Sequence, residues 1–302
     1  MPTLTLADIQ IRDPFILPVA AENAYYLFGT TDKNAWNGAG QGFDCYRSRD
    51  LQCWEGPIAA FRPPPGFWAT TNFWAPEAHY YQGKYYLFAS FKAPNRYRGT
   101  QILVSDAPQG PYLPLTDAPI TPPNWECLDG TLHVDPYGNP WIVFCHEWVQ
   151  IHNGAVYALP LSQDLTWPVG RPIHLFNASE AAWVRKTDWP KPEAHNGLRF
   201  PTFVTDGPFL YRTQTGVLLM LWSSIGQRGY TLGLARSLSA QINGPWVQLD
   251  TPLWEEDGGH GMVFRDFEGQ LHMTIHQPNQ SPFERPRLFK LQDCSDTLKI
   301  QE

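Results

Sequence analysis

The stretch "FPTFVTDGPFLYRTQTGVLLMLWSS" (residues 200–224) sets two β-prone runs on either side of a polar turn and carries an acid, Asp206, at its head. Alone it predicts an ordinary β-hairpin. Four other parts of the chain repeat the plan of polar head, strand, turn, and second strand rich in aromatic or β-branched residues. The five heads and second strands read "IRDPFI" and "YYLFGT", "WAPEAHYY" and "YYLFAS", "LDGTLHV" and "WIVFCH", "TDGPFLY" and "LLMLWSS", "GGHGMVF" and "LHMTIH".

Third and fourth strands with a polar corner follow the first four pairs, whereas the fifth unit offers only "RPRLFKLQD" before the chain ends. Four strands repeated radially form the blade of a β-propeller, which leaves only short, protected sheet edges. The sequence therefore predicts an all-β, five-bladed β-propeller with four antiparallel strands per blade, as a single domain over residues 1–302. The polar, proline-interrupted segment 177–200 breaks the rhythm and predicts a surface insertion that could wall a pocket.

Composition excludes several classes of protein. Charged residues make up 17% of the chain, and the 24 Gly and 29 Pro suit short strands joined by tight turns. A net charge of -7 without any Lys/Arg-rich run argues against nucleic acid as a partner. The five cysteines form no CxxC pair, so neither a zinc site nor a disulfide framework is expected. The sequence contains no pattern that indicates the oligomeric state.

No apolar run is long enough to span a membrane, and the sequence "MPTLTLADIQ" at its start lacks the basic and apolar regions of a signal peptide. We therefore expect a cytoplasmic protein with no membrane partner. It would be secreted or periplasmic if a signal peptide had been removed.

Prolines indicate that the heads begin edge strands. The innermost strand of each propeller blade faces the axis with unpaired backbone groups, so a residue without an N–H is tolerated there. Pro14, Pro76 and Pro208 occupy such positions, close to Asp13, Glu77 and Asp206. The acids are therefore expected in comparable places near the axis.

Three carboxylates carry the predicted chemistry. Asp13, Asp129 and Asp206 stand at the heads of units one, three and four, so folding should gather them around the axis. Crowded carboxylates repel one another, which raises the pKa of at least one of them. Inverting glycoside hydrolysis uses such a set, because it needs a protonated and an ionised carboxyl roughly 6.5–9.5 Å apart. A third carboxylate can keep the pKa of the acid raised.

With these motifs in place, essentially the whole chain resembles glycoside hydrolase family 43, five-bladed propellers that invert configuration at furanosides and xylosides. The resemblance implies that Asp13 in "IRDPFI" is the general base and that Asp129 in "LDGTLHV" modulates the pKa of the acid. It usually places a Glu in "EGP" as general acid, where this chain has Asp206 in "TDGPFLY". This departure makes Glu147 in "FCHEWVQ" the substitute candidate for the acid.

Further residues complete the predicted site. Trp74 and Glu77 belong to the "WAPE" signature of the second blade, and Trp74 and Trp148 are candidates to stack on sugar rings. Arg285 is a candidate to bind a sugar hydroxyl or carboxyl. The resemblance also implies that His260 helps to hold a calcium ion or a water cluster on the axis. Because calcium prefers oxygen ligands, a structural calcium is carried only as an option, and no other cofactor is expected.

We expect an exo-acting inverting glycosidase that removes terminal sugars from side chains of plant-type polysaccharides or oligosaccharides, since the insertion 177–200 could close one side of the cavity into a pocket. α-L-Arabinofuranose is the first expectation for the sugar. β-D-Galactofuranose, β-D-xylose and β-1,3-linked galactose are alternatives within the class. A non-catalytic sugar-binding propeller is the alternative from another class, favoured by the change from Glu to Asp in the fourth head.

Overall fold

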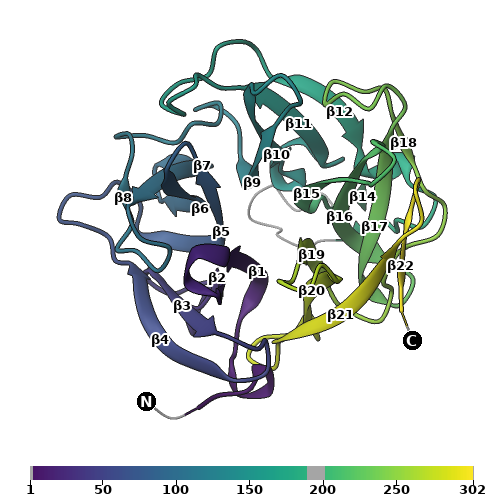
Figure 1. The fold of residues 1–302 in the computed structure, drawn as a ribbon. Coiled ribbons are helices and arrows are strands. Elements are labelled where there is room, and N and C mark those ends of the chain that lie inside the picture. The colour runs from purple at the N-terminus through teal and green to yellow at the C-terminus, as the bar shows by residue number, and fades with distance from the viewer. Residues whose placement is uncertain (1–2, 189–200, 302) are drawn as a thin grey trace.

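Five four-stranded antiparallel sheets stand around a common axis in the computed structural model, which describes residues 3–188 and 201–301 (Figure 1). The five-bladed β-propeller predicted from the repeated heads is therefore confirmed. No helix among the described residues is long and apolar enough to cross a membrane.

Each blade is contiguous in sequence and its strands pair in chain order. The blades are, in order, β1 Arg12–Val19, β2 Ala24–Thr30, β3 Phe43–Ser48 and β4 Trp54–Phe61; β5 Thr71–Tyr81, β6 Lys84–Ala93, β7 Arg96–Ser105 and β8 Leu113–Pro114; β9 Cys127–Val134, β10 Pro140–His146, β11 Ala155–Pro160 and β12 Ile173–Asn177; β15 Asp206–Arg212, β16 Leu218–Gly226, β17 Gly229–Ser237 and β18 Trp246–Gln248; β19 Gly259–Arg265, β20 Leu271–Gln277, β21 Arg285–Asp293 and β22 Leu298–Ile300. The remaining elements are η1 Leu6–Asp8, η2 Ala20–Glu22, α1 Trp148–Ile151, η3 Ala178–Glu180, β13 Thr187–Asp188 and β14 Pro201–Thr202.

The polar heads begin the innermost strands. β1, β5, β9, β15 and β19 each end the strand order of their sheet and line the axis (Figure 1). Because the strands alternate in direction, all five heads lie at the same end of the axis. The fifth blade is complete, since β22 supplies the fourth strand that the sequence did not reveal.

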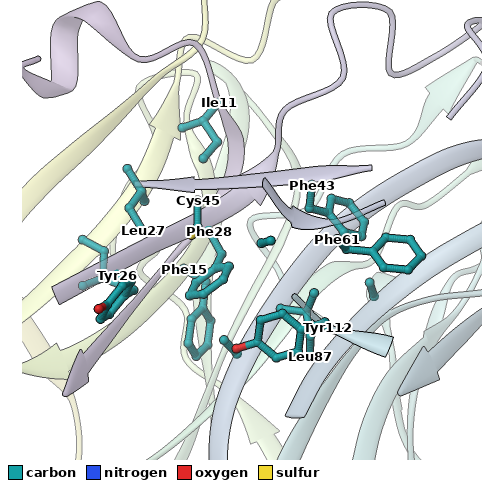
Figure 2. Close-up of a cluster of buried hydrophobic side chains, with 14 of the residues drawn as sticks. Ile11, Phe15, Tyr26, Leu27, Phe28, Phe43, Cys45, Phe61, Leu87 and Tyr112 are labelled. Carbon is teal, nitrogen blue, oxygen red and sulfur yellow. The ribbon is translucent and has the colours of Figure 1, made fainter. Parts of the chain in front are cut away.

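The core lies between the blades, because both faces of each sheet are covered by neighbours. All seven residues of β2 are buried, which explains why the second strands read as continuous apolar runs rather than as alternating ones. Between blades one and two, for example, Phe43 and Phe61 pack with their ring centroids 6.0 Å apart, near Tyr112 and Leu87 (Figure 2).

The insertion after blade three is only partly on the surface. Trp183 is buried, with its ring centroid 4.9 Å from that of Trp222 in β16. The expectation of a wholly superficial segment 177–200 is therefore wrong for residues 178–184, whose apolar side chains help to fill the gap between blades three and four. β13 and β14 pair at the base of the insertion. Residues 189–200 lie outside the described part of the chain, so the predicted pocket wall is not tested.

The ring closes between blades five and one without a shared strand, since every sheet is built from consecutive strands. Side chains join this seam instead. Tyr25 stacks on Phe267 with ring centroids 4.4 Å apart, and the Arg12 guanidinium lies 3.4 Å from the buried Glu284 carboxylate. The Arg285 guanidinium donates a hydrogen bond of 2.8 Å to the carbonyl of Ala7.

Candidate active site

A left-handed residue kinks the head of every inner strand. The φ angles are 54° at Asp13, 46° at Ala75, 55° at Asp129, 53° at Gly207 and 52° at His260. Each of these residues precedes a proline or a glycine in the sequence. Each kink also coincides with a break in the pairing between the first and second strands. For the four residues other than glycine, this conformation costs roughly 1–2 kcal/mol each, so the surrounding contacts must hold it.

A hydrogen bond from the preceding blade holds four of the five kinks. In each case the N–H of the left-handed residue donates to the side chain near the end of the neighbouring blade's second strand. These bonds run from Asp13 to His276 Nδ1 (3.1 Å), from Ala75 to Thr30 Oγ1 (2.8 Å), from Asp129 to Ser90 Oγ (2.8 Å) and from His260 to Ser223 Oγ (2.8 Å). The heads are thus positioned by contacts between blades.

The fourth blade departs from this scheme. The residue corresponding to Thr30 and Ser90 is His146, which instead pairs with Gln150. The N–H of Gly207 donates to the Asp129 carboxylate, with a distance of 3.0 Å to Oδ2. Asp206 therefore stands one position before the kinked residue. Its position relative to the kink thus differs from those of Asp13 and Asp129 by one residue, although its carboxyl still lies within electrostatic reach of theirs.

The imidazole of His260 lies between two of the carboxyls. Its Nδ1 atom is 3.2 Å from Asp13 Oδ1 and 3.7 Å from Asp129 Oδ2. Burial alone would lower the pKa of His260, but the charges of Asp13 and Asp129 outweigh burial and raise it. The raised pKa favours the protonated ring, whose charge neutralises part of the negative charge in the cluster. Its Nε2 is buried without a partner in the described part of the chain.

Asp13 is the ionised member of the cluster. Burial would raise its pKa, but His260 and Arg12 lower it below the ordinary value. The hydroxyl of Thr30 donates to Asp13 Oδ2 at 2.7 Å. The side chain is 11% exposed, so one face of this carboxylate can still meet a molecule from solution.

Asp129 and Asp206 have raised pKa values, chiefly because burial penalises their charged forms. The negative charge of Asp206 also disfavours ionisation of Asp129. The two carboxyls therefore retain a proton at a pH at which ordinary carboxyls have lost it. Asp129 is buried, whereas Asp206 is partly exposed, so Asp206 is the better placed of the two to reach a bound molecule.

Glu147 belongs to a neighbouring ion pair. It immediately precedes α1, is 5% exposed, and pairs with the buried guanidinium of Arg98. Burial raises the pKa of Glu147 while Arg98 opposes the rise. The charge of Glu147 also contributes to the raised pKa of Asp206. The structure thus places Glu147, the substitute candidate for the acid, near the other carboxyls, but in an ion pair with Arg98.

Two tryptophans stand beside this pair. The Arg98 guanidinium lies 4.2 Å from the ring centroid of Trp74, whose Nε1 donates to the carbonyl of Ala35 at 2.7 Å. Trp36, half exposed, meets Trp74 edge to face with centroids 5.2 Å apart. Trp74 is therefore fixed in place, and Trp36 offers an aromatic surface next to it.

The other predicted residues lie at different depths. Glu77 is buried two residues beyond the kink of β5 and pairs with His79, with a distance of 3.2 Å from Nε2 to Oε2. Trp148 is the first residue of α1 and is partly exposed. Arg285 does not join the cluster. Its Nε and Nη1 atoms bind the carbonyls of Ala7, Pro282 and Glu284 at the seam.

A metal site is not evident around His260. Among residues 3–188 and 201–301, no three His, Cys, Asp or Glu side chains form a group that could hold a metal ion. A protonated His260 would also repel a cation placed next to it. The calcium ion stays a prediction of the sequence.

Sequence reasoning missed three residues of the site, Tyr230, His276 and Arg98. The hydroxyl of Tyr230 donates to Asp206 Oδ2 at 3.1 Å. His276 ends "LHMTIH" at the position that Thr30 holds in "YYLFGT", so the repeat contained a signal for it. Tyr230 and Arg98 lie at the starts of third strands, where no motif distinguishes them.

Comparison with known proteins gives a consistent picture. The sequence profile described as Glycosyl hydrolases family 43 matches residues 6–292. A search of curated proteins found no match. Among solved structures, an endo-arabinase from Bacteroides thetaiotaomicron VPI-5482 superposes with a TM-score of 0.89 at 39% identity, covering 98% of this chain and 99% of that one.

Two more distant structures share the fold. A thermostable family-43 glycoside hydrolase superposes with a TM-score of 0.80 at 23% identity, over 100% of this chain and 96% of that one. An α-L-arabinofuranosidase from Lactobacillus brevis superposes with a TM-score of 0.74 at 16% identity, over 96% of this chain and 93% of that one. At these identities the likeness supports the architecture alone.

Proposed function

The chain belongs to glycosyl hydrolase family 43 and is an inverting glycoside hydrolase, and from that premise we propose that it cleaves α-L-arabinofuranosidic bonds. In this proposal Asp13 is the general base, Asp206 is the general acid, and Asp129 keeps the pKa of Asp206 raised. The observation that carries the assignment is the opposite direction of the pKa shifts at two partly exposed carboxyls, lowered at Asp13 and raised at Asp206.

The reaction needs these opposite states at the same time. Ionised Asp13 accepts a proton from a water molecule, whose oxygen attacks the anomeric carbon. The bond from that carbon to the leaving oxygen breaks on the opposite face of the sugar, and protonated Asp206 gives its proton to that oxygen. Buried Asp129 does not contact the sugar. It accepts the Gly207 N–H, next to Asp206, and because the two carboxyls repel each other when both are ionised, it would modulate the pKa of the acid.

Asp206 is a better candidate for the acid than Glu147. A general acid must hold a proton before the reaction and lose it during the bond cleavage. Burial raises the pKa of Glu147 too, but its pairing with Arg98 opposes that rise and occupies one of its carboxylate oxygens. Within the described part of the chain, the Asp206 side chain accepts the neutral Tyr230 hydroxyl and no hydrogen bond from a cationic side chain.

Arabinose as the sugar is supported by the name of the structural neighbour at 39% identity. We propose release of a terminal residue as the first mode of action. Cleavage within an arabinan chain is the second candidate, favoured because the same neighbour is described as an endo-arabinase. Products distinguish the two, since the first mode yields arabinose alone and the second yields oligosaccharides from the earliest time points.

A substrate panel tests the proposal. We would measure kcat/KM on aryl α-L-arabinofuranoside, β-D-galactofuranoside, β-D-xyloside and β-D-galactoside, together with the products formed from linear arabinan. The expected result is activity on the arabinose substrates. Activity on another sugar alone would overturn the choice of sugar. Binding of sugars without cleavage of any of them would instead favour a sugar-binding propeller.

The assigned acid is tested with the Asp206→Ala variant. Its kcat should fall roughly 10²–10⁴-fold on arabinosides with poor leaving groups and far less on an activated aryl glycoside, which needs no proton. The Glu147→Ala variant is the comparison, and the reverse pattern between the two variants would transfer the role to Glu147.

A further inference from the structure

The hydroxyl of Tyr230 is the only neutral donor that the described structure aims at the Asp206 side chain. It lies 3.1 Å from Oδ2, and Tyr230 is 3% exposed at the start of β17. Burial, followed by the neighbouring carboxylates, raises the pKa of Tyr230 well above its ordinary value. The phenol therefore stays protonated and can only donate to an ionised Asp206.

The ring of Tyr230 packs against His276 and Gly259. One face stacks on His276, with ring centroids 5.4 Å apart and planes 21° from parallel. The other contacts involve Gly259, where an added Cβ would come within 2.8 Å of the Tyr230 ring. A side chain at position 259 would therefore displace the phenol.

The backbone of Tyr230 is tied to the loop before β19. Its N–H donates to Asp257 Oδ1 at 3.2 Å, and its carbonyl accepts the N–H of Gly258 at 2.9 Å. Both ends of the residue are thus held, so the hydroxyl has little freedom to leave the carboxyl it contacts.

From these contacts we propose that Tyr230 is a positioning residue that holds the carboxyl of Asp206 in the orientation from which it donates its proton. The proposal rests on the assignment of Asp206 as the general acid. With Oδ2 accepting the phenol hydrogen, the proton to be transferred sits on the other oxygen, Oδ1. After transfer, the phenol stabilises the carboxylate that is left.

The same stack connects the acid to the base. Burial and the charge of Arg12 lower the pKa of His276 to about 3, so its ring is neutral. Its Nδ1 accepts the N–H of Asp13 at 3.1 Å, and its Nε2 therefore carries the hydrogen donated to Asn279 Oδ1. A shift of the Tyr230 ring would be transmitted through His276 to the kink that carries Asp13.

The test is Tyr230→Phe, assayed as kcat and kcat/KM against pH on aryl arabinofuranosides of graded leaving-group ability. Loss of the donor raises the pKa of Asp206, so activity should persist to higher pH, with the alkaline limb moving up by about one unit. kcat should fall at least about tenfold on poor leaving groups and little on good ones, because only the former need a well-aimed proton. If Tyr230 were merely structural, its substitution would lower kcat equally on all substrates and would leave the alkaline limb of the pH profile in place. Either result would overturn the proposal.

Tyr211→Phe is the matched control, because its hydroxyl donates to Asp293 at 2.9 Å away from the acids. It should change neither the limb nor the leaving-group dependence. Site-specific 3-fluorotyrosine at position 230 keeps the size of the residue in case the Phe variant folds poorly. As a stronger donor it should move the alkaline limb down, and an upward shift would contradict the proposal.

Failure of this inference differs from failure of the proposed function. If Asp206→Ala shows no dependence on the leaving group, Asp206 is not the acid and both proposals fall. If Asp206→Ala shows that dependence while Tyr230→Phe does not, only the role of Tyr230 is overturned.

Discussion

At the scale of single residues, protonation in the site follows from how charge is distributed among buried groups. At Asp13 the charges of His260 and Arg12 outweigh burial and lower the pKa, whereas at Asp206 burial, with the charges of Glu147 and Asp13, outweighs His260 and raises it. Two aspartates of one cluster thus have pKa values shifted in opposite directions. Activity should show a bell-shaped pH dependence, with Asp13 setting the acidic limb and Asp206 the alkaline limb.

Glu147→Gln should move the alkaline limb of this profile to lower pH. The negative charge of Glu147 raises the pKa of Asp206, so its removal lets the acid lose its proton earlier. The measurement is kcat/KM against pH, with the melting temperature as a check on folding, because Arg98 is left buried without its carboxylate. Glu284→Gln removes a buried partner of Arg12 instead and should leave the alkaline limb in place.

Asp129→Asn should reduce activity yet stabilise the fold, more at pH 8 than at pH 5. A raised pKa in the folded state costs stability progressively as the pH rises from the unfolded value of roughly 3.9 towards the folded value. Asparagine avoids that cost and keeps an acceptor for the Gly207 N–H. Melting temperatures at the two pH values measure the effect.

Asp135→Asn is the control for this comparison. The pKa of Asp135 is lowered by its turn hydrogen bonds with Asn139 and Tyr137, which outweigh burial. Its stabilisation is fully present above the unfolded value and is lost only as the pH falls through the folded value. The variant should therefore lose the same stability at pH 5 and pH 8. An equal effect of Asp129→Asn at both values would contradict a raised pKa at Asp129.

The sequence predicted which carboxyls lie at the heads, but it could not predict their register or their partners. Asp13 and Asp206 both precede a Pro by one or two residues, and only the backbone shows that the kink falls on Asp13 in one head and on Gly207 in the other. Tyr230 reaches Asp206 across a sheet, a contact set by tertiary packing rather than by any local pattern.

At the scale of elements, the kinked head is the unit that builds the site. A left-handed residue followed by Pro or Gly turns the inner strand, and a polar side chain from the preceding blade holds the turn. The repeat in the sequence already contained both parts, because Thr30, Ser90 and Ser223 occur at or near the ends of three of the five second strands. The short outer strand β22 carried too little pattern to be foreseen.

Gly207→Ala should damage both stability and activity, whereas Gly138→Ala should affect stability alone. Both glycines have positive φ angles, of 53° and 83°, which should cost an alanine roughly 1–2 kcal/mol. An added Cβ at position 207 would also meet the His260 ring at 2.8 Å, while position 138 has open space. Urea unfolding and kcat separate the two effects, and equal losses of activity would argue against the kink as a part of the site.

At the scale of the whole molecule, the seam between blades five and one replaces a shared strand with side-chain contacts. Arg285 takes part in this closure through the carbonyl of Ala7, in the segment that precedes β1. The residue that the sequence offered as a sugar ligand is therefore placed where it can join the two ends of the chain.

Arg285→Ala should lower the melting temperature by several degrees and leave KM unchanged. Hydrogen bonds from a charged donor contribute about 1.5–3 kcal/mol, and each kcal/mol shifts the melting temperature of a large domain by roughly 2–4 °C. Arg287→Ala is the matched control on the same strand, where the guanidinium lies 5.8 Å from the Phe289 ring centroid. A rise in KM specific to Arg285→Ala would restore its role in binding sugar.

The seam also makes catalytic activity depend on the folding of the last blade. Asp13 belongs to the first blade, yet its proton affinity and its kink depend on His260 and His276 of the last. Closing a loop of this length is entropically costly and follows the local assembly of blades. A chain that has formed only four blades therefore lacks the two histidines that position Asp13 and lower its pKa. We expect hydrolytic activity only when the fifth blade docks onto the first.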